Sequence, residues 1–258
     1  MLTHEVMRNV YAPFLARGAA YYSTDLRTAE LAKHASNAFL ALNASFLNGL
    51  ARICEASGAD VVALTDIMRS DPRFCRDSVE AGLGWDGSCF PSDLAAFRSQ
   101  AIRLGYRFGL LDEIARLNNE ALNAAFNKVQ DALWNLEEKR VVLLGLAVRQ
   151  GIDDVCESPS LRLAQQLGSA GAKVVIWDPR GNASPSVEAA GLEVVKDVYA
   201  AAEGANCLVV CTEWAEIKTL DLTRLRAIVA VPVIVEICST PTLSGRPDSP
   251  IFPPDGRP

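Results

Sequence analysis

The feature that most restricts the fold is a series of short apolar runs in the second half of the chain. They occupy residues 141–146, 173–178, 192–195, 207–212 and 232–236. Stretches with helical character separate most of them, at residues 158–171, 184–190, 197–204 and 222–228. Continuous Val- and Ile-rich runs that alternate with helices are typical of a parallel sheet covered on both faces. We therefore expect a Rossmann-like α/β domain over residues 137–240.

The first half of the chain has helical periodicity instead. Apolar side chains recur at three- and four-residue steps over residues 24–55, which predicts one unusually long helix. Thr24 or Ser23 can cap its start, and Gly58 ends it. Further helices are expected at residues 60–68, 92–104 and 110–136, with a loop rich in Gly and Pro at residues 70–91.

These patterns predict a helical domain followed by an α/β domain. The helical domain, which carries the long central helix, is expected over residues 1–136. A tail rich in Pro, Gly, Ser and Asp follows the α/β domain, and we expect residues 241–258 to be disordered.

Charge and composition argue against several classes of function. The formal net charge is −6 and no basic cluster is present, so neither nucleic acid nor an anionic membrane surface is an expected partner. The N-terminus shows neither a signal peptide nor a membrane span. For six of the seven cysteines we expect buried, reduced thiols of a cytoplasmic protein. No His, Cys and acidic residues have metal-ligand spacing, so no metal is expected.

The turn after the first apolar run lacks the dinucleotide fingerprint. It runs Gly145-Leu-Ala-Val-Arg-Gln-Gly151 rather than G-x-G-x-x-G. Open parallel sheets nevertheless bind ligands at the carboxyl ends of their strands, so the fold predicts a nucleotide-sized crevice, though not one for NAD. A tight turn alone would account for the glycine equally well.

Cys89 is the candidate with the most informative surroundings. It lies in a glycine-rich loop just before an expected helix, with Pro91 suited to the first helical turn. A helix N-terminus favours the thiolate, which is the form that attacks a carbonyl. Asp93 lies one helical turn further on. From these residues alone, a glycine loop with a buried cysteine remains the more common explanation.

Lys33 and Asn37 form a second candidate pair. They are four residues apart and therefore share one face of the long helix. Together they could stabilise a developing oxyanion and hold a water molecule. A solvated helix face is the usual explanation for such a pair, and it remains open.

These stretches resemble the UDP-glucose/GDP-mannose dehydrogenase family in the family's own order. The motif A-E-x-x-K-x-x-x-N-x-F is matched at residues 29–39, and A-G-x-G-[WYF]-G-G-S-C-F-P-K-D at residues 81–93. The stretch L-G-x-A-F-K-…-D-x-R-E-S-P is matched at residues 144–159, and T-E-W at residues 212–214. Several ordered motifs are more specific than any one of them. Their Gly-Trp and Cys-Phe-Pro variants are more similar to UDP-glucose enzymes than to GDP-mannose enzymes.

The resemblance implies NAD-dependent oxidation of UDP-glucose to UDP-glucuronate in two steps. Cys89 would trap the intermediate aldehyde as a thiohemiacetal, and the resulting thioester would be hydrolysed. Lys33, Asn37 and Asp93 would orient the water and stabilise charge. The resemblance also implies a homodimer through the helix at residues 24–55, and a UDP-sugar site that includes Arg73 (reaching the neighbouring subunit), Gly82, Gly84, Trp85, Gly87 and Arg149.

The chain departs from the family pattern at positions that would hold NAD. The family's N-terminal dinucleotide-binding domain would precede residue 1. Ser92 stands for the lysine of F-P-K-D, and Cys156 stands for an arginine that contacts NAD in the family. We therefore expect this chain alone to bind no cofactor and not to turn over. Glu80 and Asp86 add negative charge where a diphosphate would lie.

Three hypotheses about function follow. The chain is part of a dehydrogenase whose NAD domain is elsewhere, a UDP-sugar-binding module without redox activity, or a structural or regulatory paralogue that pairs with a full-length enzyme through its long helix.

Overall fold

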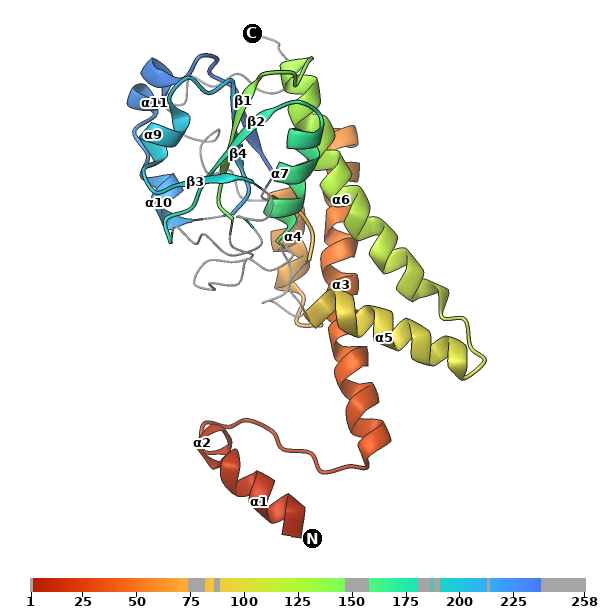
Figure 1. Cartoon of the computed structure of the whole chain (residues 1–258). Helices are drawn as coiled ribbons and strands as arrows, with labels where there is room; N and C mark the ends of the chain where they lie inside the picture. Colours follow the sequence, from red (N-terminus) through yellow and green to blue (C-terminus); the bar gives the residue numbers. More distant parts are fainter. Residues whose placement is uncertain are drawn as a thin grey trace.

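The computed structural model places a helical region beside a five-stranded sheet with helices on both faces (Figure 1). It describes residues 2–73, 82–85, 89–146, 158–180, 187, 191–212 and 214–237. The predicted fold class, a helical region with a long central helix followed by a Rossmann-like parallel sheet, is confirmed.

The long helix α3 spans Leu26–Ser57. Its N-cap is Asp25, whose Oδ1 accepts a hydrogen bond from the backbone N–H of Thr28 at 3.1 Å. The predicted caps Thr24 and Ser23 are therefore wrong, because a carboxylate one residue closer satisfies the free N–H and also complements the helix dipole. Gly58 ends the helix with φ +73°, as predicted.

Three further helices complete the part of the helical region that contacts α3. They are α4 (Val61–Ser70), α5 (Cys89–Arg103) and α6 (Gly109–Leu133). Because α5 begins three residues earlier than predicted, Cys89 belongs to its first turn rather than to the preceding loop. Two short helices, α1 (Leu2–Val10) and α2 (Ala12–Leu15), were not predicted and lie apart from the rest of the molecule (Figure 1).

All five strands run parallel, in the order β3-β2-β1-β4-β5. They are β1 (Arg140–Leu144), β2 (Lys173–Trp177), β3 (Glu193–Val195), β4 (Cys207–Val210) and β5 (Ile234–Glu236). The chain passes outward from β1 to β3 and then returns to the other side of β1 at β4. This reversal makes the carboxyl ends of β1 and β4 the switch point, where open α/β sheets bind ligands.

The two faces of the sheet have separate cores. Val141 and Leu143 face α6 and α7 (Pro159–Ser169), whereas Val142 and Leu144 face the other layer. That layer consists of α9 (Val198–Ala202), α10 (Ala215–Lys218) and α11 (Leu222–Ile228). The predicted helix at residues 184–190 lies almost wholly outside the described residues.

Helix α6 takes part in two cores. Its N-terminal half contributes Leu111 and Ile114 to a core with α3 and α5. Its C-terminal half contributes Ala125 and Val129 to the core on one face of the sheet. Each such side chain that is removed from water stabilises the fold by about 1.5–3 kcal/mol for a Leu, Ile or Val. The predicted domain boundary between residues 136 and 137 stays a prediction. Helix α6, which ends before this boundary, packs in the cores of both regions.

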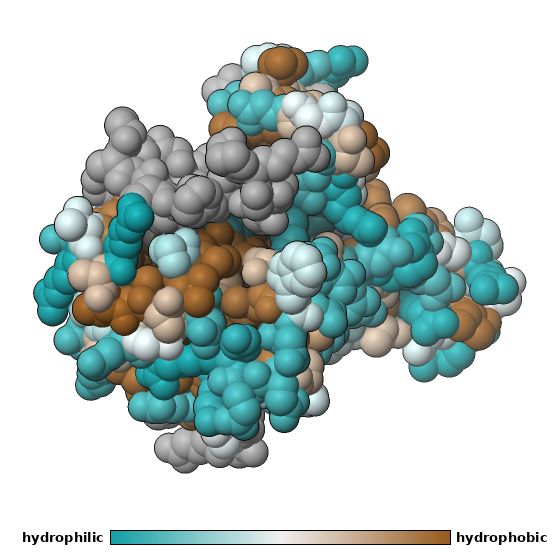
Figure 2. All heavy atoms as spheres, turned by 90° about the horizontal axis from the view of Figure 1, so that it is seen from above, coloured by the Kyte–Doolittle hydropathy of each residue, from teal (hydrophilic) through white to brown (hydrophobic). Residues whose placement is uncertain are grey.

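When the molecule is seen from above, hydrophobic residues gather within the broad part on the left (Figure 2). The narrower projection on the right is covered mostly by hydrophilic residues. Among the described residues, no helix combines the length and the apolar character needed to span a membrane.

Candidate functional site

A buried carboxylate on α5 meets three side chains of α3. Asp93 is only 5% exposed, and its Oδ1 accepts hydrogen bonds from Lys33 Nζ at 3.1 Å and pairs with His34 Nδ1 at 3.1 Å. Its Oδ2 accepts a hydrogen bond from the Asn37 amide. Lys33 is 65% exposed, so its ammonium group is open to solvent as well as to Asp93. The structure thus brings together three of the four predicted catalytic residues.

The environment keeps Asp93 ionised. Burial acts to raise the pKa of its carboxyl group, but the hydrogen bonds from Lys33 and Asn37, together with the charge of Lys33, outweigh burial and lower the pKa. His34 also contacts this carboxylate and stacks on Phe97, with ring centroids 6.4 Å apart. Sequence reasoning missed His34, because the motif A-E-x-x-K-x-x-x-N leaves that position unspecified.

Cys89 is the first residue of the same helix and lies one turn before Asp93. Its side chain lies outside the described atoms. Its backbone position at the start of a 15-residue helix is the position at which the helix dipole stabilises a thiolate. The helix α5 therefore carries the predicted nucleophile and the carboxylate on consecutive turns.

The glycine-rich loop before Cys89 is held by buried polar side chains. The N–H of Gly82 donates to Asn48 Oδ1 on α3 at 2.8 Å. The Trp85 backbone exchanges two hydrogen bonds with the Asn118 amide on α6, at 2.8 Å and 3.1 Å. The indole N–H of Trp85 donates to Ser45 Oγ on α3 at 2.8 Å. Because buried polar groups without partners are costly, these contacts specify the course of the loop.

Gly84 is required by this arrangement. Its φ of +117° is in the region that favours glycine, and a Cβ atom there would lie 2.4 Å from Asn118 Oδ1. Sequence reasoning singled out Gly82, Gly84 and Trp85 but missed Ser45, Asn48 and Asn118. The available signal was the presence of polar residues on helix faces that are otherwise apolar.

Close contacts hold the turns that follow β1 and β2 near the switch point of the sheet. Gly145 has φ +107°, and a Cβ atom there would lie 2.6 Å from Thr212 Cβ. Asp178, which follows β2 and is 1% exposed, accepts hydrogen bonds from the N–H groups of Leu146 and Arg180, both at 2.9 Å. In a dinucleotide-binding Rossmann domain the acidic residue after the second strand binds the ribose. Here the described residues use that carboxylate to hold the first turn, so they do not fit NAD.

Two models of one protein family match the chain. The central domain of the UDP-glucose/GDP-mannose dehydrogenase family matches residues 27–120, which include the Asp93 cluster and the glycine loop. The UDP binding domain of the same family matches residues 142–240, which include the parallel sheet after the start of β1. The chain belongs to the UDP-glucose/GDP-mannose dehydrogenase family.

Known relatives and solved structures agree with this membership of the dehydrogenase family. UDP-glucose 6-dehydrogenase TuaD of Bacillus subtilis is 33% identical over 232 residues, which are 90% of this chain and 50% of that protein. UDP-glucose 6-dehydrogenase of Rhizobium meliloti is 35% identical over 90% of this chain and 54% of that protein. A UDP-glucose dehydrogenase structure from Pyrobaculum islandicum superimposes with a TM-score of 0.78 at 30% identity, covering 91% of this chain and 52% of that one. The chain thus spans about half the length of these relatives.

The remaining dehydrogenase-family positions are not gathered in the described site. Arg73 follows α4, is exposed, and pairs with Asp71 Oδ2 at 2.6 Å. Ser92 is exposed in the first turn of α5. Gly87, Arg149 and Cys156 lie outside the described residues.

Three of the six thiols expected to be buried and reduced are described, and each is buried and in no disulfide with a described residue. Cys54, Cys207 and Cys211 are free and buried. Burial raises the pKa of the Cys207 and Cys211 thiols to about 12, so neither is a nucleophile at neutral pH. The part of the chain that the structure describes contains no group of His, Cys, Asp and Glu suited to a metal.

Proposed function

We propose that this chain supplies the nucleophile, the water-orienting residues and the sugar-nucleotide site of an NAD-dependent UDP-glucose 6-dehydrogenase. The observation that carries the proposal is the contact of Asp93 with Lys33 and Asn37, one helical turn beyond Cys89. The names of the relatives and the match to a UDP binding domain support the choice of substrate. Buried thiols that form no disulfide among the described residues support a cytoplasmic setting.

The steps that fall to this chain are addition and hydrolysis. The Cys89 thiolate adds to the C6 aldehyde carbon, and the oxygen that becomes negative is stabilised by the exposed ammonium group of Lys33. After oxidation to the thioester, water attacks the same carbon, the C–S bond breaks, and the thiolate leaves. Asp93, ionised and held by Lys33 and Asn37, orients that water, whose proton passes to solvent.

The glycine loop supports substrate placement in this proposal. Gly82, Gly84 and Trp85 bring the chain back to Cys89 along a path fixed by α3 and α6. The crevice for UDP would lie at the carboxyl ends of the strands, where Arg149 follows β1. NAD does not fit the described residues of the sheet, so its binding would fall to residues outside them.

A homodimer through α3 is part of the proposal. Phe39, Phe46 and Ile53 recur every seven residues on this helix and are 61%, 51% and 63% exposed. A seven-residue apolar repeat is the pattern with which helices pair along one seam. Arg73, which is exposed and pairs with Asp71, would then exchange this partner for the sugar site of the neighbouring subunit.

The dimer is tested by light scattering after size exclusion. We expect a dimer for the chain and a monomer for Phe46→Asp, because a carboxylate in the seam would be buried without a partner. The matched control is Leu104→Asp, which changes an exposed leucine outside the seam and should leave the dimer intact. A monomeric parent chain, or dissociation by both substitutions, would contradict the proposal.

The sugar-nucleotide site is tested by thermal-shift titration with UDP, UDP-glucose, UDP-glucuronate, GDP-mannose and NAD. A ligand that binds only the folded chain raises its melting temperature. We expect UDP compounds to stabilise the 258-residue chain, and NAD and GDP-mannose to have little effect. No shift with any UDP compound would reject the proposed site.

A second candidate function is UDP-sugar binding without redox chemistry. It is favoured by the use of Asp178 to hold the first turn of the sheet, which leaves the described residues without a ribose-binding carboxylate. For the chain tested alone we expect no NADH formation from UDP-glucose and NAD. Formation of NADH that Cys89→Ser abolishes would reject this expectation and favour a complete enzyme.

A further inference from the structure

Three neighbouring hollows that share lining residues lie along α6, and the first of them reaches Trp85 and α5 of the candidate site. One part, of about 990 Å³, lies between Trp85, α5, α6 and α7. A second part, of about 640 Å³, continues along α6 and α7, and it shares Arg162 and Gln165 with the first. A third part, of about 440 Å³, lies by the turn between α5 and α6, and it shares Arg98 and Asp112 with the first. We call the three together the α6 furrow.

Side-chain amides line much of the α6 furrow. Asn119, Asn123 and Asn127 lie four residues apart on one face of α6, opposite Gln165 and Gln166 of α7. Each amide both donates and accepts hydrogen bonds, which suits the hydroxyl groups of sugars. Asn123, Asn127 and Gln165 are exposed, so their amides are open to a ligand in the furrow.

Apolar side chains also line the α6 furrow. Trp85, Leu94 and Ala115 line the first part of the furrow, and Phe126 lines the second. A surface that combines amides with apolar and aromatic groups matches a sugar ring, which has hydroxyls at its edge and C–H groups on its faces. A purely apolar partner would leave the amides unpaired.

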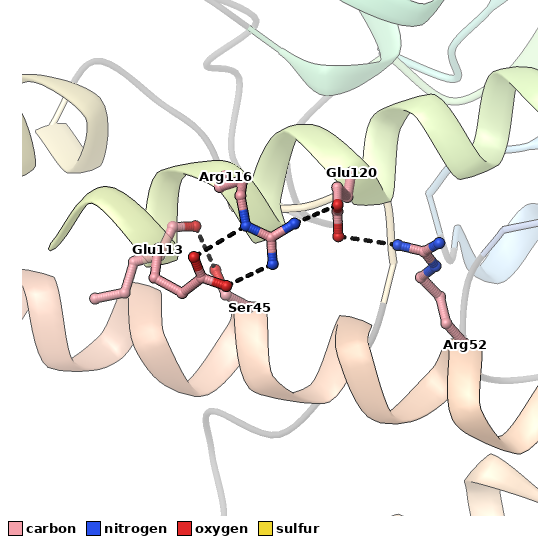
Figure 3. A network of polar contacts seen from close by, with 6 residues as sticks. Ser45, Arg52, Glu113, Arg116 and Glu120 are labelled. Atoms are coloured by element: carbon pink, nitrogen blue, oxygen red, sulfur yellow. Dashed lines mark hydrogen bonds and ion pairs between the residues drawn. The ribbon is translucent and has the colours of Figure 1, made fainter. Parts of the chain in front are cut away.

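The charges of the furrow favour carboxylates that are spaced apart. Arg98 is paired with Asp112 at 2.5 Å. The guanidinium group of Arg116 is held by Glu113 and Glu120, and Glu120 in turn is bound by Arg52 of α3 (Figure 3). These two arginines are therefore already neutralised.

Two other guanidinium groups have no carboxylate partner among the described residues. Arg162 donates from Nη2 to the neutral Oδ1 of Asn119 at 3.1 Å. Arg107 lines the third part of the furrow, just before α6 begins. Ten residues of helix separate the start of α6 from Asn119, which corresponds to about 15 Å. A diphosphate, whose charges are adjacent, would not reach both cations, whereas a chain with a carboxylate on successive units would.

We propose that the α6 furrow binds a linear chain of hexuronate sugars. The amides and the two separated arginines favour a polyhydroxylated chain whose carboxylates are spaced apart. The choice of hexuronate rests on the proposed function, because this is the sugar that the proposed oxidation makes. Trp85 and Leu94 line the furrow, and they belong to the segments that lead to Cys89 and carry Asp93. A bound glycan would therefore contact two segments of the candidate site, the glycine-rich loop and α5.

Isothermal titration calorimetry of the whole chain at low salt tests this inference. The ligands are a hexauronate, the same hexamer with its carboxyl groups reduced, monomeric glucuronate, UDP-glucuronate and a poly-glutamate peptide. We expect the hexauronate to bind and Arg162→Gln to weaken it about tenfold, as for loss of one charge-assisted hydrogen bond. Arg103→Gln, an exposed arginine of α5 outside the furrow, is the matched control and should have no effect.

Several outcomes would overturn the inference. Equal binding of the reduced hexamer would mean that carboxylates are not recognised. Equal binding of poly-glutamate would point to an acidic protein segment, and displacement of the hexauronate by monomeric glucuronate or UDP-glucuronate would place the glycan elsewhere.

A second variant tests the same furrow. Asn123→Trp, which fills the second part of the furrow, should also abolish binding while the circular dichroism spectrum stays unchanged.

The inference and the proposed function can fail separately. UDP-glucuronate should still raise the melting temperature of Arg162→Gln, because Arg162 lies outside the proposed sugar-nucleotide site. Absence of that shift in the parent chain, with the hexauronate still bound, would reject the proposed function alone.

Discussion

Two buried aspartates, Asp93 in the helical region and Asp178 beside the sheet, are satisfied in different ways. Asp178 accepts hydrogen bonds from two backbone N–H groups close to the switch point. Asp93 accepts them from side chains on another helix, one of which is a mostly exposed lysine. Moving a carboxylate away from buried backbone N–H groups leaves those groups without an acceptor, which destabilises the fold. A carboxylate held by side chains can instead exchange one of them for substrate or water. The comparison assigns a structural role to Asp178 and a chemical role to Asp93.

The largest expected effect is the difference in stability between two alanine variants. We expect Asp178→Ala to destabilise the fold by about 2–4 kcal/mol, because two N–H groups near the switch point lose their acceptor. Asp93→Ala should cost less, because Lys33 remains solvated when the carboxylate is removed. Urea denaturation measures both variants. Equal losses would end the distinction drawn between the two carboxylates.

A smaller difference is expected between two glycines that pack on polar side chains. Gly145→Ala should destabilise by about 2–4 kcal/mol and Gly84→Ala by about 1–3 kcal/mol, since both have positive φ and close neighbours. The ranking follows from the contacts: the Cβ atom at Gly145 meets Thr212 Cβ, which is fixed to the backbone, whereas that at Gly84 meets the end of the Asn118 side chain.

Gly82→Ala is the control for these two variants. A Cβ atom at Gly82 meets nothing within 4 Å, so we expect little change in the denaturation midpoint. A greater loss for Gly84→Ala than for Gly145→Ala would mean that the glycine loop, not the switch point, is the more rigid of the two regions.

The smallest effect concerns pH. The pKa of Asp93 is lowered in the folded chain, so its interactions stabilise the fold above the unfolded-state pKa of about 3.9. That contribution is lost as the pH falls through the lower folded-state pKa. The difference in stability between the parent chain and Asp93→Asn should therefore shrink as the pH falls below about pH 4. A difference that grows below about pH 4 would contradict the assigned protonation state.

Local patterns in the sequence predicted most of the regular structure. Helix α11 has the predicted bounds, and each strand lies within or one residue from its apolar run, because a fully buried strand needs an uninterrupted series of apolar residues. The four-residue helix α10 is too short to show any periodicity, and it was missed. The start of α5 was placed too late because glycine and proline near Cys89 were taken as loop residues.

The candidate site was predicted only in part, because its supporting residues act over long sequence separations. Lys33, Asn37 and Asp93 were identified through motif residues, and the structure brings them into contact. Asn48 and Asn118 are more than thirty residues from the loop atoms they bind, and nothing in their own neighbourhood marks them as partners. The predicted substrate-binding positions Gly87 and Arg149 lie outside the described residues, so their roles stay predictions.

Because two cores share helix α6, we expect them to fold and unfold together. Its 25 residues extend about 37 Å, and one end is buried with α3 and α5 while the other is buried with the sheet. Neither core can lose this helix and persist, so the amide protons at both ends should exchange with solvent through the same opening event. The helical region and the sheet, although they match separate family domains, would then melt in a single transition.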